Sequence, residues 1–140
     1  MPLVRISVSS STTPKQREAI AHSVYEAMRA TIGIPEGDRF ILVTPHGEGE
    51  MFIDPGFMGM RRCSSFMLVQ IFLSKGRTIE QKQALYAQIA GKLHLAVGVS
   101  TEDVMTVLTE NTPADWSFGN GEAQFVLNPP SWVKQSQEGK

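Results

Sequence analysis

The second residue of this chain can supply a reactive amine. Pro2 follows Met1 directly, and a small second residue normally allows the initiator methionine to be removed. Pro2 would then carry a free secondary amine, and an α-amino group titrates near neutrality, at a pKa of about 7.7–8.0. Such a group can act as a base, an acid or a nucleophile. Many proteins begin with Met-Pro for no chemical reason, so the rest of the chain must decide whether this amine is used.

Metal and thiol chemistry find little support elsewhere in the sequence. His22 and His94 have no second histidine or cysteine at metal-ligand spacing. The single cysteine, Cys63, has no evident partner, and one cysteine excludes an internal disulfide. We therefore expect neither a metal site nor a catalytic thiol.

A duplicated pattern predicts the elements that would hold the amine in place. A shift of 65 positions aligns residues 2–44 with residues 67–109 without a gap. The shift superposes residues with the same roles at helix starts and helix ends: Thr13 on Thr78, Gln16 on Gln81 and Gly33 on Gly98. Threonine followed three residues later by glutamine is a capping box, and glycine is the usual helix stop. Each unit therefore predicts a β-α-β motif with a right-handed crossover and parallel strands.

The expected fold class is α/β (α+β). Two tandem β-α-β repeats would form a four-stranded mixed sheet with two helices on one face, plus a short extra strand near Met51–Ile53. The other sheet face would need cover from the tail or from another subunit. We expect one domain over residues 1–127, with repeats of about 2–65 and 66–125, followed by a C-terminal tail over 128–140.

Composition and charge argue against several kinds of partner. The net charge is −1, and no basic run is longer than Arg61-Arg62, which argues against nucleic acid and anionic membrane surfaces. The longest apolar stretch, residues 66–73, is too short to span a bilayer. The amino-terminal residues alternate as a strand and show no signal-peptide pattern, so we expect a cytoplasmic protein.

Several short motifs carry a family resemblance. They are Pro2-Leu3, Ile34-Pro35-Glu36-Gly37-Asp38-Arg39-Phe40, Gly76-Arg77-Thr78, Thr109-Glu110-Asn111 and Asp115-Trp116-Ser117-Phe118-Gly119-Asn120-Gly121. With them the chain resembles the tautomerase superfamily, whose members use an amino-terminal proline, and within it the malonate semialdehyde decarboxylase group. The resemblance spans about residues 2–125. It implies a homotrimer, conversion of malonate semialdehyde to acetaldehyde and carbon dioxide, and no metal or organic cofactor.

The resemblance also implies roles for individual residues. Pro2 would be the catalytic amine, Asp38 its acidic partner, and Arg77 the group that binds the substrate carboxylate. Trp116 and Phe118 would form an apolar wall of the substrate site. Some members have a second arginine two residues before the one that matches Arg77, and this chain has Lys75 there, which we include as a substrate-binding candidate.

These roles fit the loss of carbon dioxide from a 3-oxo acid. The electrons left behind must flow into the carbonyl, which a protonated Pro2 can polarise or a neutral Pro2 can attack to form an iminium. Arg77 offers a planar fork that matches a carboxylate. A nearby Asp38 would raise the pKa of the Pro2 amine. That shift would favour a decarboxylase using the acid route, or a hydratase, over a tautomerase, which needs the neutral amine.

Other functions stay open at this point. The chain could be a promiscuous keto–enol tautomerase, a hydratase or dehalogenase of unsaturated acids, or a non-catalytic trimeric binding protein. Asp38 aligns with Asp103, so a turn could explain both residues, and Arg77 could be a solvated loop charge. Trp116 and Phe118 could serve the core, as aromatic residues usually do.

Overall fold

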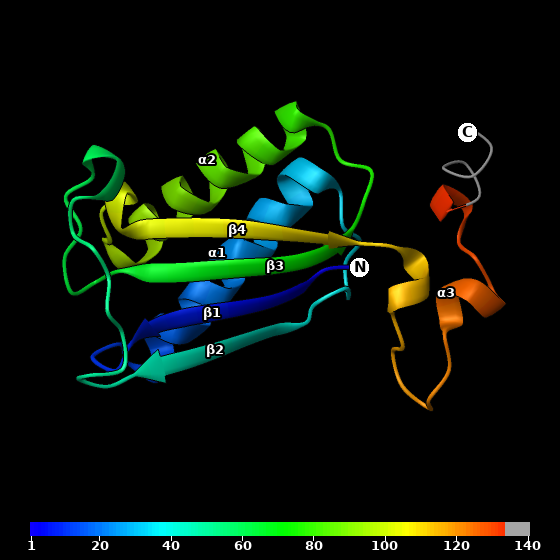
Figure 1. Cartoon of the computed structure of the whole chain (residues 1–140), viewed down its shortest axis with the longest axis horizontal. Coiled ribbons are helices and arrows are strands. Elements are labelled where there is room, and N and C mark those ends of the chain that lie inside the picture. Colours follow the sequence, from blue (N-terminus) through cyan, green and yellow to red (C-terminus); the bar gives the residue numbers. More distant parts are fainter. Residues whose placement is uncertain (134–140) are drawn as a thin grey trace.

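Two long helices lie against one face of a four-stranded sheet in the computed structural model of this chain (Figure 1). The structure describes residues 1–133. The strands follow the order β2-β1-β3-β4, and their bounds are β1 Leu3–Ser9, β2 Ile41–His46, β3 Met67–Ser74 and β4 Val104–Asn111. The pairs β1–β2 and β3–β4 are parallel, whereas β1 and β3 are antiparallel. This mixed sheet, made from two β-α-β units, confirms the predicted fold.

The two helices begin and end with the same devices. Helix α1 covers Pro14–Ile32 and α2 covers Ile79–Val97, each starting with a complete capping box at a threonine N-cap. Each helix ends at a glycine in the left-handed conformation, with φ of 65° at Gly33 and 72° at Gly98. A residue with a side chain would be strained there, so glycine ends both helices.

The strand register repeats as well. In the first unit Val4 lies opposite Ile41, and in the second unit Val69 lies opposite Thr106. Both residues of the second pair are shifted by 65 positions from the first. The duplication read from the sequence is therefore present in the helix caps, the helix ends and the strand pairing.

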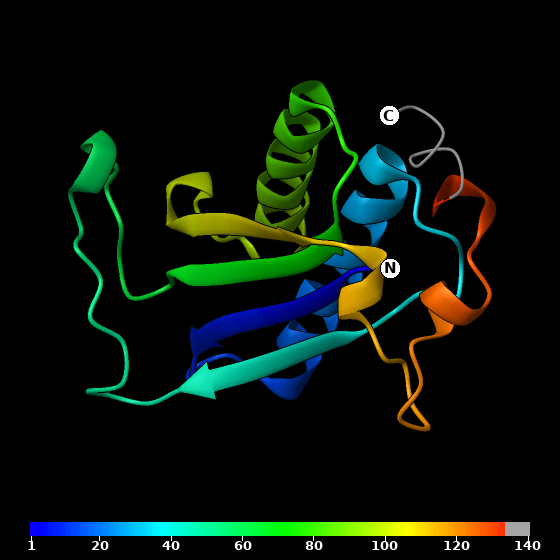
Figure 2. The same cartoon turned by 45° about the vertical axis from the view of Figure 1, so that its right-hand side comes forward.

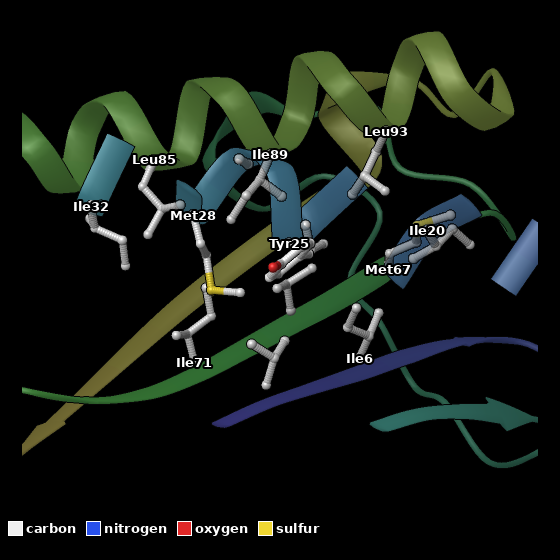
Figure 3. Packing of buried hydrophobic residues seen from close by; sticks show 14 of the residues in the cluster. Ile6, Ile20, Tyr25, Met28, Ile32, Met67, Ile71, Leu85, Ile89 and Leu93 are labelled. Atoms are coloured by element: carbon white, nitrogen blue, oxygen red, sulfur yellow. The ribbon is translucent and has the colours of Figure 1, made fainter. Parts of the chain in front are cut away.

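The core lies between the sheet and the helix layer (Figure 3). In β1 every second residue points inward, so Val4, Ile6 and Val8 are at most 1% exposed. The helices contribute fully buried side chains at helical spacing: Ile20, Val24 and Met28 from α1, and Leu85, Ile89 and Leu93 from α2. This packing stabilises the sheet, so the ends of its strands are firmly placed.

The sheet face opposite the helices keeps apolar side chains in solvent. Leu42 of β2 is 58% exposed, and Met105 and Val107 of β4 are 43% and 39% exposed. The described part of the tail leaves these side chains uncovered. The sequence predicted that either the tail or another subunit would cover this face, and another subunit is the alternative that stays a prediction.

The segment between β2 and β3 is irregular. The prediction of a short strand near Met51–Ile53 is wrong. The described residues 47–66 include one short 3₁₀ turn, η1 (Phe57–Gly59), and no strand. A strand needs a neighbour for its backbone hydrogen bonds. This segment instead extends away from the sheet (Figure 2), and Phe52 is 88% exposed.

The remaining described elements are short. They are the 3₁₀ turns η2 (Thr101–Asp103) and η3 (Pro113–Asp115) and the helix α3 (Gln124–Leu127). Within residues 1–133 no helix is long and apolar enough to cross a membrane. Of the predicted tail, the first part packs, since Val133 is only 3% exposed, and residues 134–140 lie outside the described residues.

Candidate active site

The topology brings the chain start and two loops to one edge of the sheet. Strand β1 runs antiparallel to β3, so its beginning lies beside the end of β3, with Leu3 opposite Phe72. The loop that enters β2 reaches the same edge, because the Val4 N–H donates to the Phe40 carbonyl at 2.9 Å. The loop from β3 to α2 also starts there. The same edge therefore carries the amino terminus and the loops that contain Asp38 and Arg77.

A cavity of about 790 Å³ at this edge, which we call the ionic cavity, is lined by all three predicted charged site residues. Asp38 comes from the loop after α1, and Lys75 and Arg77 come from the loop before α2. The amino nitrogen of Met1 lies 3.9 Å from Oδ2 of Asp38. The lining includes Met1, Asp38, Lys75, Arg77, Phe125 and Trp132. The volume is in the range typical of small-molecule sites.

A second cavity, of about 480 Å³, contains the other predicted residues and is called the aromatic cavity here. It is lined by Met1, Pro2, Phe72, Asn111, Trp116 and Phe118, among others. Trp116 is held by a hydrogen bond of 2.8 Å from its Nε1 to Oδ1 of Asn111, and its ring stacks on Phe118 at 5.6 Å. The ring pair forms a wall next to Pro2, so these aromatic residues line a cavity and do not fill the core.

Met1 lies between the two cavities and lines both of them. Pro2 is buried and lines only the aromatic cavity. Among residues 1–133 the two lining sets share only Met1, so a chain that starts at Pro2 would have its amine near their junction. The charged and aromatic candidates would then face one amine from two sides.

The Met1 amino group is affected by burial as well as by the charges around it. Burial lowers the pKa of the Met1 amino group below its usual value of 8.0. The negative charge of Asp38 opposes this shift, and the positive charge of Arg77 adds to it. Asp38 therefore raises the pKa of this α-amino group, as expected of a nearby carboxylate, but the loss of hydration on burial is the larger effect. The sequence motifs do not show how deeply the amino group is buried, so this effect could not be predicted from them.

Asp38 has few partners for its charge. Burial raises the pKa of its carboxyl group, while the amino group and Arg77 act in the opposite direction. Its Oδ1 is buried and accepts no hydrogen bond from the described residues. A buried carboxylate with a free oxygen is suited to exchanging a proton with the neighbouring amine or with a ligand.

Arg77 is fixed by its own loop. Its Nη1 donates to the Ser74 carbonyl at 2.7 Å, just before the N-cap Thr78 of α2. Burial lowers the pKa of the Arg77 guanidinium, and the charges of Glu110 and Asp38 oppose this shift. The group remains cationic, since an arginine side chain does not deprotonate in proteins. The helix start adds positive potential, so this corner of the ionic cavity suits a carboxylate.

Lys75 lies beside Arg77 in the lining of the ionic cavity. Its backbone N–H donates to the Asn111 carbonyl at 2.9 Å, which extends the pairing of β3 with β4 by one residue. Its charge also contributes to the lowered pKa of Asp115, whose main causes are hydrogen bonds from the backbone and hydroxyl of Thr112. Lys75 therefore adds positive charge between the two cavities.

Two further aromatic residues line the ionic cavity and were not predicted as site residues. The edge of Phe125 meets Phe118 at 4.6 Å, and Phe125 meets Trp132 edge-on at 5.3 Å. The four rings of Trp116, Phe118, Phe125 and Trp132 thus run from one cavity to the other. The clustering of aromatic residues after position 115, in a chain with only 8% aromatic residues, could have indicated this wall.

Asp103, which matches Asp38 in the second repeat, has a different environment. Asp103 is 1% exposed and accepts hydrogen bonds from the backbone N–H of Cys63 at 2.8 Å and from its Sγ at 3.0 Å. Cys63, for which the sequence suggested no partner, therefore holds the central segment to the sheet. Asp103 is satisfied by its neighbours, whereas Asp38 lies opposite an amine.

Comparisons with known proteins agree with this arrangement. Residues 38–119 match the sequence profile of the tautomerase enzyme family. The probable tautomerase YusQ of Bacillus subtilis (strain 168) is 35% identical over 126 residues, which cover 90% of this chain and 99% of the relative.

Solved structures of other proteins are also similar to this chain. FG41 malonate semialdehyde decarboxylase inhibited by 3-bromopropiolate has a TM-score of 0.85 and 38% identity, covering 92% of this chain and 98% of its own. A malonate semialdehyde decarboxylase solved as wild type, as a proline-to-alanine mutant and in inactivated form has a TM-score of 0.84 and 32% identity, covering 91% and 98%. A symmetric trimer of fused 4-OT shares the fold at 22% identity, with a TM-score of 0.75 and coverage of 90% and 98%. The duplicated fold, the matched profile and these relatives show that the chain belongs to the tautomerase superfamily of enzymes.

Proposed function

We propose that this chain is a cofactor-independent decarboxylase that converts malonate semialdehyde, or a similar short 3-oxo acid, to an aldehyde and carbon dioxide. The observation that carries the proposal is the shared location of the amino terminus, Asp38 and Arg77 in one cavity, with the Met1 amino nitrogen 3.9 Å from the Asp38 carboxylate. Similarity to two malonate semialdehyde decarboxylases supports the choice of substrate.

In the proposed reaction Arg77 binds the substrate carboxylate and the Pro2 amine acts on the aldehyde carbonyl. The bond between the carboxylate carbon and its neighbour breaks, carbon dioxide leaves, and the electron pair moves into the carbonyl. A proton then adds to the carbon, which gives acetaldehyde. Asp38 can hold the proton that the amine gives or receives, and positioned proton transfer contributes about 10²–10⁴-fold to a rate.

The aromatic wall would act on the leaving carboxylate. Trp116 and Phe118 offer no charge to a carboxylate, so the neutral product is tolerated better than the anion next to them. Lys75 would add attraction for the incoming acid, as a second cation beside Arg77.

Keto–enol tautomerisation is the second candidate, and burial of the amine favours it. A tautomerase needs a neutral amine at neutral pH, and burial lowers the pKa of the amino group at this place. The relative named as a probable tautomerase points the same way. Hydration of unsaturated acids is a variant of the first candidate, since one of the two decarboxylases is described with decarboxylase and hydratase activities.

We also propose that the chain assembles as a homotrimer through the open sheet face. The exposed apolar residues Leu42, Met105 and Val107 supply a surface that a second copy could cover. Fused 4-OT, which shares the fold, is a trimer.

The test is turnover of malonate semialdehyde and of phenylenolpyruvate by protein whose first residue is shown by mass spectrometry to be Pro2. We expect faster acetaldehyde release than ketonisation of the enol, and loss of that release in Pro2→Ala. Arg77→Leu should raise KM for the acid by at least about tenfold, because a charge-assisted pair is worth about 1.5–3 kcal/mol. Enol turnover without decarboxylation would replace the first candidate by the second. Activity that survives Pro2→Ala would contradict both.

A further inference from the structure

The carboxylate of Glu110 acts electrostatically on Arg77. Glu110, the residue before the end of β4, lies opposite Leu73 in the strand pairing, one residue before the Ser74 carbonyl that holds Arg77. The negative charge of Glu110 raises the pKa of the Arg77 guanidinium, whereas burial lowers it. An unneutralised carboxylate there would attract the fork that a substrate carboxylate needs.

Lys82 neutralises this carboxylate. Its Nζ lies 2.6 Å from Oε1 of Glu110, and the side chains are 26% and 34% exposed. Lys82 belongs to the first turn of α2, where its backbone N–H donates to the Thr78 carbonyl at 3.1 Å. The lysine is therefore anchored by the same helix start that follows Arg77.

The first repeat forms the same helix start without this ion pair. With the shift of 65 positions, Lys82 matches Arg17 and Glu110 matches Pro45. Arg77 matches Thr12. Arg17 donates to the Thr12 carbonyl at 2.5 Å, with no carboxylate at the matching strand position. The fold therefore does not require the pair, which occurs in the repeat that carries Arg77.

We propose that Lys82 is a positioning residue that holds Glu110 away from Arg77 and so keeps the guanidinium free for the substrate carboxylate. The inference rests on the proposed function to the extent that Arg77 receives that carboxylate. Lys82 lies outside the motifs that carry the family resemblance. In this proposal it acts through Glu110 and does not touch the substrate.

The test uses Lys82→Met, Lys82→Arg, Glu110→Gln and the double variant Lys82→Met/Glu110→Gln in the full chain. Lys92→Met is the matched control, because it removes the same charge from the other end of α2. KM and kcat are measured with malonate semialdehyde. The Kd for malonate, which is not decarboxylated by this route, is measured by calorimetry, and thermal unfolding checks that each variant folds.

Lys82→Met should raise KM and the malonate Kd by about three- to tenfold, with kcat changed less than about twofold, since the pair is partly exposed. Lys82→Arg should restore both values. Glu110→Gln alone should have little effect, and the double variant should behave like the wild type. Lys92→Met should leave KM and Kd unchanged, which separates the local pair from a general loss of positive charge.

Each other outcome has a definite meaning. An unchanged malonate Kd in Lys82→Met would overturn the positioning role, even if decarboxylation is confirmed. An equal effect of Lys82→Met with and without Glu110→Gln would overturn it too, because the lysine would then act alone. If the wild type binds malonate without decarboxylating malonate semialdehyde, the proposed function fails while the Kd series still tests Lys82. If the wild type neither binds malonate nor decarboxylates malonate semialdehyde, both proposals fail.

Discussion

At the scale of single residues, burial sets the protonation of the site. It lowers the pKa of the amino group and raises the pKa of the Asp38 carboxyl group, so both shifts favour the neutral forms. The mutual attraction of amine and carboxylate opposes both shifts and is the smaller effect. The pair is therefore closer to exchanging a proton than two such groups in water would be.

Ionised Asp38 should destabilise the fold. A carboxyl group with a raised pKa in the folded state binds its proton more tightly there than in the unfolded chain. Its contribution is favourable below its unfolded pKa and is lost as the pH rises through the folded pKa. Asp38→Asn should therefore raise the melting temperature at pH 7, with a difference that shrinks as the pH falls through the folded pKa and is gone below the unfolded pKa of about 4. Calorimetry of both proteins across this range checks the sign, and a lower melting temperature for Asp38→Asn at pH 7 would contradict it.

The same substitution should lower the pKa of the amine. Asp38 favours the charged amine, so its removal leaves burial and Arg77 to act without opposition. NMR titration of Pro2 in protein that lacks Met1 measures this pKa directly. We expect a lower value in Asp38→Asn than in the wild type, and the basic limb of an acid-catalysed rate profile should move to lower pH with it. An unchanged titration would mean that the carboxylate does not act on the Pro2 amine.

At the scale of elements, the two capping boxes provide a comparison within one molecule. Thr13 and Thr78 make the same hydrogen bonds at the starts of α1 and α2, at 3.1 Å to the N3 backbone in each. Only Thr78 follows a predicted site residue, Arg77. The capping box therefore stabilises a helix start in both repeats, and in the second repeat it also lies next to the candidate site.

Thr13→Ala and Thr78→Ala should each lower the free energy of unfolding by about 0.5–2 kcal/mol, because each removes an N-cap. Only Thr78→Ala should raise KM, since fraying of the first turn of α2 would release Arg77. Urea unfolding and steady-state kinetics on both variants check the pair of expectations. Equal KM changes in the two variants would indicate a general loss of stability, and would remove the link between this cap and Arg77.

At the scale of the whole molecule, the open sheet face predicts assembly. Sedimentation should give a mass three times that of the 15.4 kDa chain. Leu42→Glu should shift the mass toward a single chain, because it places a charge in an apolar contact. Leu95→Glu is the control, since Leu95 is 85% exposed on α2, in the layer away from that face. A wild-type mass near 15.4 kDa, or a trimer unaffected by Leu42→Glu, would contradict the proposed interface.

The repeated architecture could be predicted from the sequence because its determinants are local. Threonine caps, glycine stops and alternating strands are signals that extend over a few residues, and each of them occurs twice, 65 positions apart. The meeting of Asp38 and Arg77 at one edge also follows from strand direction. The family resemblance identified these two residues, and the topology explains why they lie together.

Other features depend on packing between distant segments. The lowered pKa of the amine reflects burial by several elements, and the contact of Cys63 with Asp103 joins residues 40 positions apart. The aromatic wall continues through Phe125 and Trp132 because the chain after β4 returns to the ionic cavity. The spacing of residues in the sequence does not determine such contacts. For the same reason the predicted short strand near Met51–Ile53 failed: no neighbouring strand pairs with that described segment.

The central claim is that a Pro2 amine at the junction of the two cavities performs the reaction. The most direct measurement is acetaldehyde release from malonate semialdehyde by two forms of the chain, one beginning at Met1 and one at Pro2, each verified by mass. We expect the form that begins at Pro2 to be faster by at least about 10²-fold, because Met1 would convert the secondary amine into an amide that is neither acid nor nucleophile. Equal rates for the two forms would contradict the claim.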